Sequence, residues 1–405
     1  MKKLGEIALG IVTGIGGFLE AGSIATASQA GSEFGFQLAW VMLLGTASLA
    51  CLMEMTGRLA AVSHRSYADL MRERFGVRFF LLPLVALLLV SFLSLAAEVG
   101  GVAITLEMAT GISLRWWAIP VALLGWALLW RGTFGLMEKG TAIFGLVALV
   151  FAVGAFKLHP HWPDVAKALL PSTPSHDRAR YWYIAVSVLG ASISPYLYVF
   201  YSAGAIEGGW TVDDLGVNRM TVSLGNIFGG ALAICVVVVA AMVLAPGHVK
   251  VDSFEPISRM LVTPLGEAGF VLFAATLFVT CFGTTLEIAL AMAYLLAEGF
   301  GWAWSQNLRP SKDARFSMTY TVAILAAAVP IVLGMNPFAL TNIAMVLTAA
   351  SLPVTVLPLI VLMNDRRILY RDTNGWMSNA ALVIISVMAI ALFVAAIPLQ
   401  VTGGG

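Results

Sequence analysis

The sequence is poor in charged residues. Only 11% of its 405 residues are Asp, Glu, Lys or Arg, whereas 60% are hydrophobic. A water-soluble domain with one core does not have this balance, so the composition predicts an all-α integral membrane protein embedded in a lipid bilayer. The formal net charge is +1, and no basic cluster is interleaved with aromatic residues. Nucleic acid is therefore not an expected partner.

Cysteine and histidine are also scarce. The sequence has three Cys and five His, and each Cys lies alone inside an apolar run. Unpaired cysteines in apolar runs are typical of small buried residues, so we expect neither disulfides nor thiolate metal sites. No nucleophile–base pair and no His-rich centre occurs at one depth. The sequence thus predicts neither an enzyme nor a bound cofactor.

Long apolar runs fill the chain. Eleven are long enough, or nearly so, to cross a bilayer, and the third and eighth exceed the usual length. These runs cover residues 5–28, 37–62, 79–109, 116–132, 141–158, 182–206, 222–246, 265–298, 317–336, 340–364 and 378–401.

The loops between these runs differ in positive charge. With a cytoplasmic N-terminus, 16 of the 23 Lys and Arg residues fall on the inside and 7 on the outside. Cytoplasmic loops of membrane proteins carry such an excess. We therefore expect a multi-pass protein of the cell (inner) membrane with its N-terminus inside and its C-terminus outside. Between the second and third runs, residues 66–78 predict a short interfacial helix that Ser66 caps.

The first run contains a carboxylate next to many glycines. Glu20 follows Gly14, Gly16 and Gly17 and precedes Gly22, near the middle of the apolar stretch. A charge at that depth costs at least about 2.5 kcal/mol, so it needs a partner, a proton or a hydrated cavity. Glycine-rich sequence favours an unwound segment, whose free carbonyls must line a cavity. The pattern indicates a cation site, and the alternative is a paired structural Glu in a glycine-packed helix.

The sixth run also predicts an interruption. Pro195 lacks an amide proton and crowds the carbonyl of Ala191, so the helix should break across residues 191–194. Two interrupted helices five spans apart are the pattern of an inverted-repeat transporter.

Several motifs resemble those of the Nramp family of divalent-metal transporters. In the first span, Glu20-Ala21-Gly22-Ser23 with Ile24-Ala25-Thr26 is similar to the family's Asp-Pro-Gly-Asn and Ile-Ala-Thr. In the sixth, Gly190-Ala191-Ser192-Ile193-Ser194-Pro195 is similar to its Gly-Ala-Thr-Val-Met-Pro. Shorter similarities in the third, eighth and tenth spans extend the resemblance over nearly the whole chain.

The resemblance implies a LeuT-type fold of about 11 transmembrane helices, with helices 1 and 6 broken. It would be a five-plus-five inverted repeat. The expected parts are residues 1–158 as the first repeat, 159–181 as an extracellular connection and 182–364 as the second repeat. Residues 365–405 would form a cytoplasmic loop, the eleventh helix and the tail.

The resemblance also implies where a cation would bind. The family's ligands correspond here to Glu20, Ser23, Ser194 and the carbonyl of Ala191, so all potential donors are oxygens. The family's thioether ligand is replaced by Ser194. Oxygen donors suit Mg²⁺, Mn²⁺ or Ca²⁺. Ser351 is a further candidate ligand, because the family often has a glutamine near that position.

The sequence predicts that transport is not coupled to protons. The family's proton-handling acid corresponds to Leu95, and its sixth-span histidines correspond to Tyr196 and Tyr201. Tyr196 is the best replacement for a pathway histidine and a candidate substrate contact, whereas Glu98 either makes a structural hydrogen bond or serves transport. Glu287 and Glu298 are expected to cap or pair within the eighth span.

These observations predict a secondary transporter of hard divalent cations that works by alternating access and is not coupled to protons. The cation would be the transported substrate. The alternatives are a LeuT-fold carrier of a small organic solute, such as an amino acid or amine, and a non-transporting sensor that has lost metal binding.

Overall fold

The computed structural model describes residues 19–132, 146–305, 307, 310 and 312–403. All regular secondary structure within these ranges is helical. Some expectations concern residues outside these described ranges. They are the expectations about the first half of the first span, with Gly14, Gly16 and Gly17, and about the start of the fifth span.

Eight segments of the described chain are long and apolar enough to cross a membrane. This set includes α5 and α15, which have 34 residues each and are therefore about 50 Å long. The two longest predicted runs are thus confirmed as helices that are longer than the roughly 30 Å hydrocarbon core of a bilayer. The eight segments are α3 (Ala39–Ser63), α5 (Val77–Thr110), α10 with α11 (Arg178–Ser192 and Pro195–Glu207), α12 (Leu215–Val243) with its flanking turns, α15 (Glu267–Phe300), α16 (Ala314–Val332), α17 (Pro337–Leu362) and α19 (Trp376–Gly403).

Shorter helices account for the other predicted spans and for the loops. The second half of the first span is α2 (Ala21–Phe34), the fourth span is α6 (Leu114–Arg131), and the described part of the fifth is η1 with α8 (Leu146–Ala148 and Leu149–Lys157). The short connecting helices are α4 (Tyr67–Phe75), α9 (Trp162–Lys167), α13 (Phe254–Arg259), α14 (Val262–Leu265) and α18 (Arg366–Leu369).

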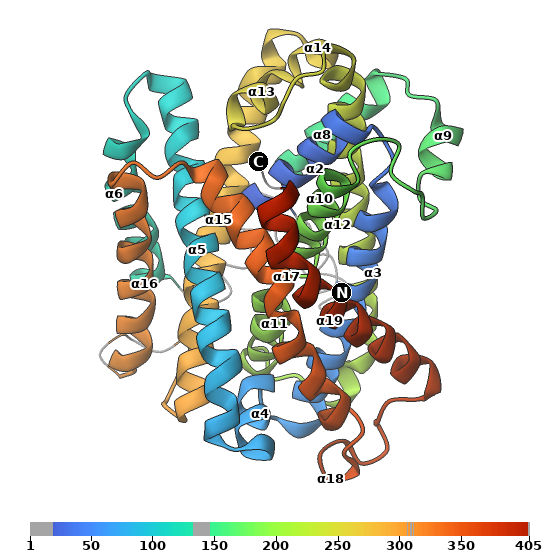
Figure 1. Ribbon diagram of the computed structural model, residues 1–405. Helices are drawn as coiled ribbons and strands as arrows, with labels where there is room; N and C mark the ends of the chain where they lie inside the picture. Colours follow the sequence, from blue (N-terminus) through green and yellow to red (C-terminus); the bar gives the residue numbers. More distant parts are fainter. Residues whose placement is uncertain (1–18, 133–145, 306, 308–309, 311, 404–405) are drawn as a thin grey trace.

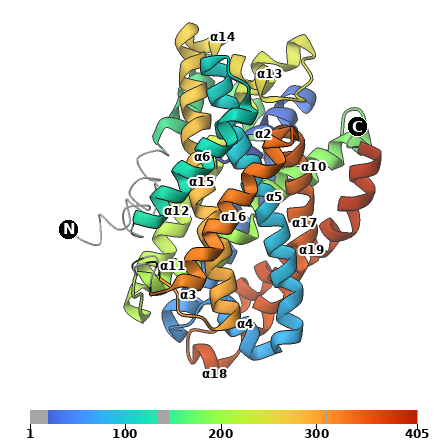
Figure 2. The same ribbon diagram turned by 90° about the vertical axis from the view of Figure 1, so that its left-hand side faces the viewer.

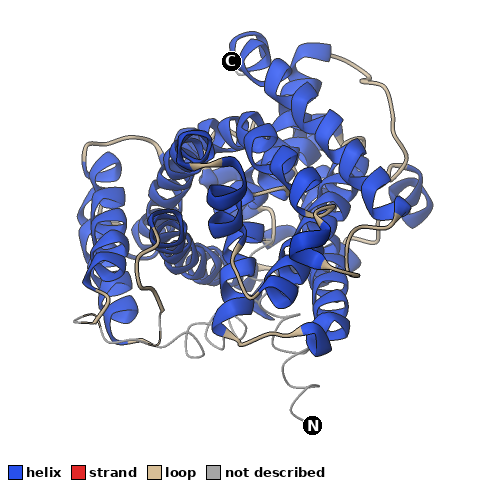
Figure 3. Ribbon diagram, turned by 90° about the horizontal axis from the view of Figure 1, so that it is seen from below, coloured by secondary structure: helices blue, strands red, loops and turns tan. Residues whose placement is uncertain are grey.

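The helices form one bundle around α2 and the interrupted sixth span, α10 with α11 (Figure 1). α5 packs along α15 and α17, α2 packs along α12, and α17 packs along α19. α6 and α16 pack on each other at one side of the bundle, which faces the viewer in Figure 2 and lies at the left edge of the end-on view in Figure 3. Interior helices are consequently covered on all sides. In α10 and α11, 94% of the most apolar 18-residue stretch is buried.

The two sets of predicted loops lie at opposite ends of the bundle. α4 and α18, which carry much of the predicted inside charge, are at the lower end in Figure 1, whereas α9, α13 and α14 are at the upper end. This arrangement agrees with the alternation of loops that the Lys and Arg distribution predicts.

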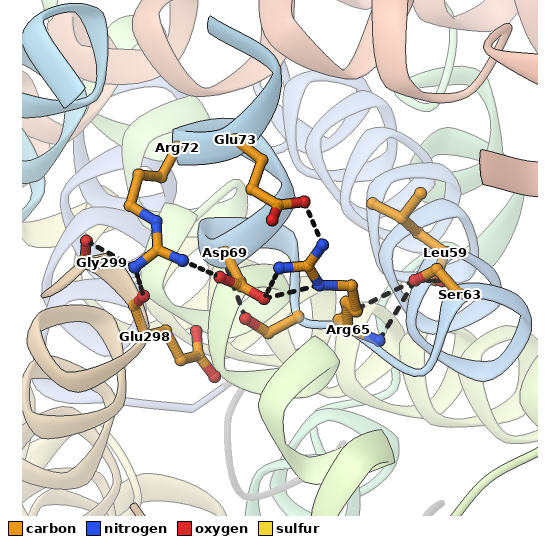
Figure 4. A network of polar contacts seen from close by, with 9 residues as sticks. Leu59, Ser63, Arg65, Asp69, Arg72, Glu73, Glu298 and Gly299 are labelled. Atoms are coloured by element: carbon orange, nitrogen blue, oxygen red, sulfur yellow. Dashed lines mark hydrogen bonds and ion pairs between the residues drawn. The ribbon is translucent and has the colours of Figure 1, made fainter. Parts of the chain in front are cut away.

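The short helix α4 closes the lower end of the bundle. Its predicted cap is confirmed, because the Ser66 hydroxyl accepts a hydrogen bond from the Asp69 amide at 3.3 Å. Arg72 donates to Asp69 and to the carbonyls of Glu298 and Gly299 at the end of α15, at 3.1 and 3.3 Å (Figure 4). The charged residues of α4 are thus engaged in fixing the helix to the bundle.

The central helices approach closely because glycines lie between them. A Cβ added to Gly190 of α10 would lie 2.0 Å from the carbonyl oxygen of Met345 on α17. Backbone atoms cannot yield as a flexible side chain can, so α10 and α17 require glycine at this crossing.

We expect Gly190→Ala to lower the unfolding free energy by about 1–3 kcal/mol, the usual cost of overpacking. The measurement is thermal unfolding of the detergent-solubilised protein. Gly216→Ala is the matched control, since a Cβ there meets nothing within 4 Å, and it should leave the midpoint unchanged or raise it slightly. Equal midpoints for the two variants would contradict the packing argument.

Candidate cation site

The sixth span is interrupted where the sequence predicts. α10 ends at Ser192, Ile193 and Ser194 leave helical geometry, and α11 begins at Pro195. Pro195 cannot donate to the carbonyl of Ala191, and the hydroxyl of Ser194 instead lies 3.3 Å from that oxygen. The break therefore presents a carbonyl and a hydroxyl to the interior of the bundle.

Glu20 lies beside this break. It precedes α2 in an extended conformation (φ −91°, ψ 171°), and its side chain does not cap its own helix. Instead, Glu20 Oε2 accepts a hydrogen bond from the Tyr196 hydroxyl at 3.0 Å, and Oε1 lies 3.5 Å from the Ser194 hydroxyl. Only 1% of Glu20 is exposed. The structure thus brings Glu20, Ala191, Ser194 and Tyr196 together at the point where the two spans meet.

Glu98 of α5 holds the beginning of α2. Its Oε1 accepts a hydrogen bond from the Ala21 amide at 3.0 Å, and its carboxylate also contacts the Cys281 thiol. The first amides of a helix have no partner inside the helix, and its N-terminus carries partial positive charge. Of the two alternatives open for Glu98, the geometry supplies the structural hydrogen bond, and this bond fixes the residue that follows Glu20.

Glu287 of α15 lies near the same region, a placement that the sequence analysis did not predict. It interacts electrostatically with Glu20 and with Tyr196, and it is 9% exposed. The expectation that it pairs within its own helix does not fit this placement, because among the described residues its side chain makes no hydrogen bond or ion pair. Its position inside an apolar span was the available signal, since a carboxylate at that depth requires a partner.

Three other predicted residues do not take part in these contacts. Ser23 is buried in the first turn of α2, and its hydroxyl donates to no group in the part of the chain that is described. Ser351 donates to the Thr348 carbonyl at 2.8 Å within α17. Tyr201 donates to Asn218 at 3.0 Å, in the region where α11 meets α12 and α3.

Met345 of α17 places a thioether near the break, a second feature that the sequence analysis missed. A Cβ on Gly22 would lie 2.6 Å from its Sδ, and the side chain packs with Ala191 and Ala344. It is 2% exposed and surrounded by apolar groups. The hydrogen-bonded groups around Glu20 are nevertheless all oxygens. Across the described ranges, no group of three or more His, Cys, Asp or Glu could hold a metal ion.

The cap on α2 can be tested by amide exchange. Glu98→Leu leaves the buried Ala21 amide without an acceptor, which costs about 1–3 kcal/mol, so hydrogen–deuterium exchange in the first turn of α2 should accelerate about tenfold or more. Glu98→Gln retains an acceptor oxygen and should keep most of the protection. Equal exchange in Glu98→Leu and the wild type would show that the cap does not hold the helix.

Comparison with known proteins places the chain in a family. The family model described as "Natural resistance-associated macrophage protein-like" (Nramp) matches residues 10–398. The divalent metal cation transporter MntH of Aeromonas hydrophila is 24% identical over 388 residues, covering 93% of this chain and 91% of the relative. MntH of Ralstonia nicotianae is 27% identical over 398 residues, covering 93% and 87%.

Solved structures agree on the fold. The Eremococcus coleocola manganese transporter, in complex with an aromatic bis-isothiourea compound, superposes with a TM-score of 0.75 at 21% identity, covering 98% of this chain and 87% of that one. MhsT in complex with L-phenylalanine superposes at 0.65 with 15% identity, covering 96% and 98%. These relatives are transporters with the LeuT-type fold, and this chain is a multi-pass membrane protein that belongs to the Nramp family.

Proposed function

We propose that the protein is a secondary transporter of divalent metal cations that works by alternating access. The observation that carries the proposal is the position of Glu20: a buried carboxylate beside the break in the sixth span, next to the carbonyl of Ala191 and two hydroxyls. Half-helices that part at mid-membrane provide backbone and side-chain oxygens for ions in transporters of this kind. The divalent metal transporters among the curated relatives support the same function.

The cation is a hard one, Mg²⁺, Mn²⁺ or Ca²⁺. Carboxylate, hydroxyl and carbonyl oxygens suit these ions, which also retain water molecules. Glu20 supplies charge, Ser194 and the carbonyl of Ala191 supply neutral donors, and Ser23 completes the set after a change in rotamer. The single proton of Ser194 can be donated to Glu20 or to Ala191, and a cation would attract both acceptors and the hydroxyl oxygen. The manganese transporter among the structural relatives makes Mn²⁺ the first ion to test.

Tyr196 acts as the exchangeable partner of Glu20. Its hydroxyl occupies one carboxylate oxygen at 3.0 Å, so that oxygen becomes available to a cation only when this hydrogen bond opens. Tyr201 and Ser351 would contribute to a pathway in another conformation. The occluded position of Glu20 and the closure of the lower end by α4 are consistent with a state between the two open ones.

The orientation in the membrane follows from charge. We place the N-terminus and the α4–α18 end in the cytoplasm and the C-terminus outside, because most Lys and Arg residues flank that end. The repeats are assigned to residues 1–158 and 182–364, with residues 159–181 as the extracellular connection. Cation release to the cytoplasm would then require α4 to loosen from α15.

Isothermal titration of purified protein with Mn²⁺, Mg²⁺ and Ca²⁺ tests the site. We expect millimolar or tighter binding by the wild type and none by Glu20→Gln, which keeps the shape of the side chain but removes its charge. Glu298→Gln is the matched control: this buried carboxylate lies at the α4 end beside Ser66 and should not affect binding. If neither the wild type nor Glu20→Gln binds a divalent cation, an organic solute or a sensor function becomes the better hypothesis.

Transport should be independent of protons. All five histidines lie at helix ends or in loops, Leu95 is buried and apolar, and Tyr196 and Tyr201 stand where the family has histidines. In proteoliposomes, Mn²⁺ influx should follow the cation gradient and the membrane potential without acidifying the lumen. Acidification of a lumenal dye that begins only on addition of Mn²⁺, and is missing with Glu20→Gln, would contradict this prediction.

A further inference from the structure

Tyr67 is buried inside the lower end of the bundle, although it belongs to a short helix at the surface. It is the first residue of the nine-residue α4 and is 0% exposed, whereas Glu73 and Arg74 at the other end of the same helix are exposed. Tyrosines at the edge of a membrane protein usually keep the hydroxyl in the wet interface. Here the hydroxyl is directed into the bundle, so α4 inserts an aromatic side chain between the spans.

Tyr67 joins two helices that come from different halves of the sequence. Its amide donates a hydrogen bond to the Ser202 hydroxyl of α11 at 3.1 Å, and its own hydroxyl donates to the Thr355 carbonyl of α17. Tyr198 of α11 is also 0% exposed and donates to the Thr355 hydroxyl at 2.6 Å. The rings of Tyr67 and Tyr198 meet edge to face, with centroids 6.4 Å apart. We call these two residues the tyrosine plug.

The tyrosine plug lies between the candidate cation site and the lower end of the bundle. Tyr196, in the first turn of α11, donates to Glu20, and Tyr198 follows two residues later. Ser202, which holds the Tyr67 amide, is six residues beyond Tyr196 and therefore about 9 Å further along α11. α4 itself lies at the lower end (Figure 1) and packs against α5, α11, α15 and α17.

The contacts of Tyr67 are of a kind that can open and close. Hydrogen bonds from an amide and a hydroxyl can be exchanged for hydrogen bonds to water when the lower end becomes hydrated. α11 is also separate from α10, because Ile193 and Ser194 between them are not helical. A tilt of α11 about this break would move Ser202 away from Thr355, and Tyr67 bridges these two residues. Such element-terminal breaks are where domain and gate motions are absorbed.

We propose that Tyr67 is the gating residue on the α4 side of the transport pathway. Its ring blocks the route between α11 and α17 in the occluded state, and it withdraws together with α4 when the cargo leaves toward the lower end. The inference rests on the proposed function and names the residue that closes one of its two exits. A purely structural anchor of α4 would behave differently, because its loss would loosen the whole bundle.

The test measures water access to the site in full-length protein without added metal. Ser194→Cys places a thiol beside Glu20, since the Ser194 hydroxyl lies 3.5 Å from Glu20 Oε1. The protein is held in vesicles made permeable, so that a charged, water-soluble maleimide reaches both ends, and peptide mass spectrometry follows the labelling of each cysteine. Adding Tyr67→Ala should accelerate labelling at position 194 at least about tenfold, because a buried ring and a hydrogen bond are lost together.

Two controls separate a gate from general loosening. Tyr370→Ala is the matched variant, since Tyr370 follows α18 at the same end of the bundle and is 70% exposed, and it should leave the labelling rate unchanged. Cys235, half-buried in α12, is the internal control, because only general loosening would increase its labelling. Equal rates at position 194 with and without Tyr67→Ala would overturn the gating role. Parallel increases at position 194 and at Cys235 would show a structural anchor.

Tyr67→Phe covers the case in which Tyr67→Ala does not fold. It keeps the ring and removes only the hydrogen bond to the Thr355 carbonyl, so labelling at position 194 should rise about two- to tenfold. An unchanged rate would overturn the gate. Because no metal is present, this result is independent of the titrations: cation binding without accelerated labelling would leave the transporter proposal intact, and accelerated labelling without cation binding would leave a gated site for another cargo.

Discussion

The hydrogen bond between Tyr196 and Glu20 is the contact on which the site depends. It joins the residue that precedes α2 to the first turn of α11, and so it links the first predicted span directly to the second half of the sixth. A charge at mid-membrane costs at least about 2.5 kcal/mol, and a hydrogen bond to a charged group contributes about 1.5–3 kcal/mol. The hydrogen bond is therefore comparable in size to the cost of the buried charge, so it can hold Glu20 in place.

The surrounding helices position this contact through backbone constraints. Gly190 allows α17 to lie against α10, and Glu98 fixes the first amide of α2. Pro195 ends one half-helix and begins the next, which leaves the carbonyl of Ala191 for the Ser194 hydroxyl. Each of these features acts on the main chain, so the geometry around Glu20 does not depend on the side chains that a transported ion must displace.

The sequence predicted those parts of the fold that local chemistry determines. Pro195 identified the break to within two residues, Ser66 identified the start of α4, and long apolar runs identified α5 and α15. Glu20 and Ser194 were paired through their family motifs, and the structure places them together. The direction in which a helical residue faces depends on packing, however, and an apolar span gives little indication of it. This is why Glu287 and Met345 were missed, and why Ser351 is engaged within its own helix instead of at the break.

The three buried acids show why proximity alone does not identify a ligand. Glu98 is held by a backbone amide at a helix N-terminus, an arrangement that favours negative charge and that a cation could not replace without unravelling α2. Glu20 is held by a hydroxyl that can rotate away. Glu287 has neither kind of partner among the described residues. Glu98, which a backbone amide holds, therefore organises the site, and under the proposed function Glu20 is the acid whose hydrogen-bond partner a cation would replace.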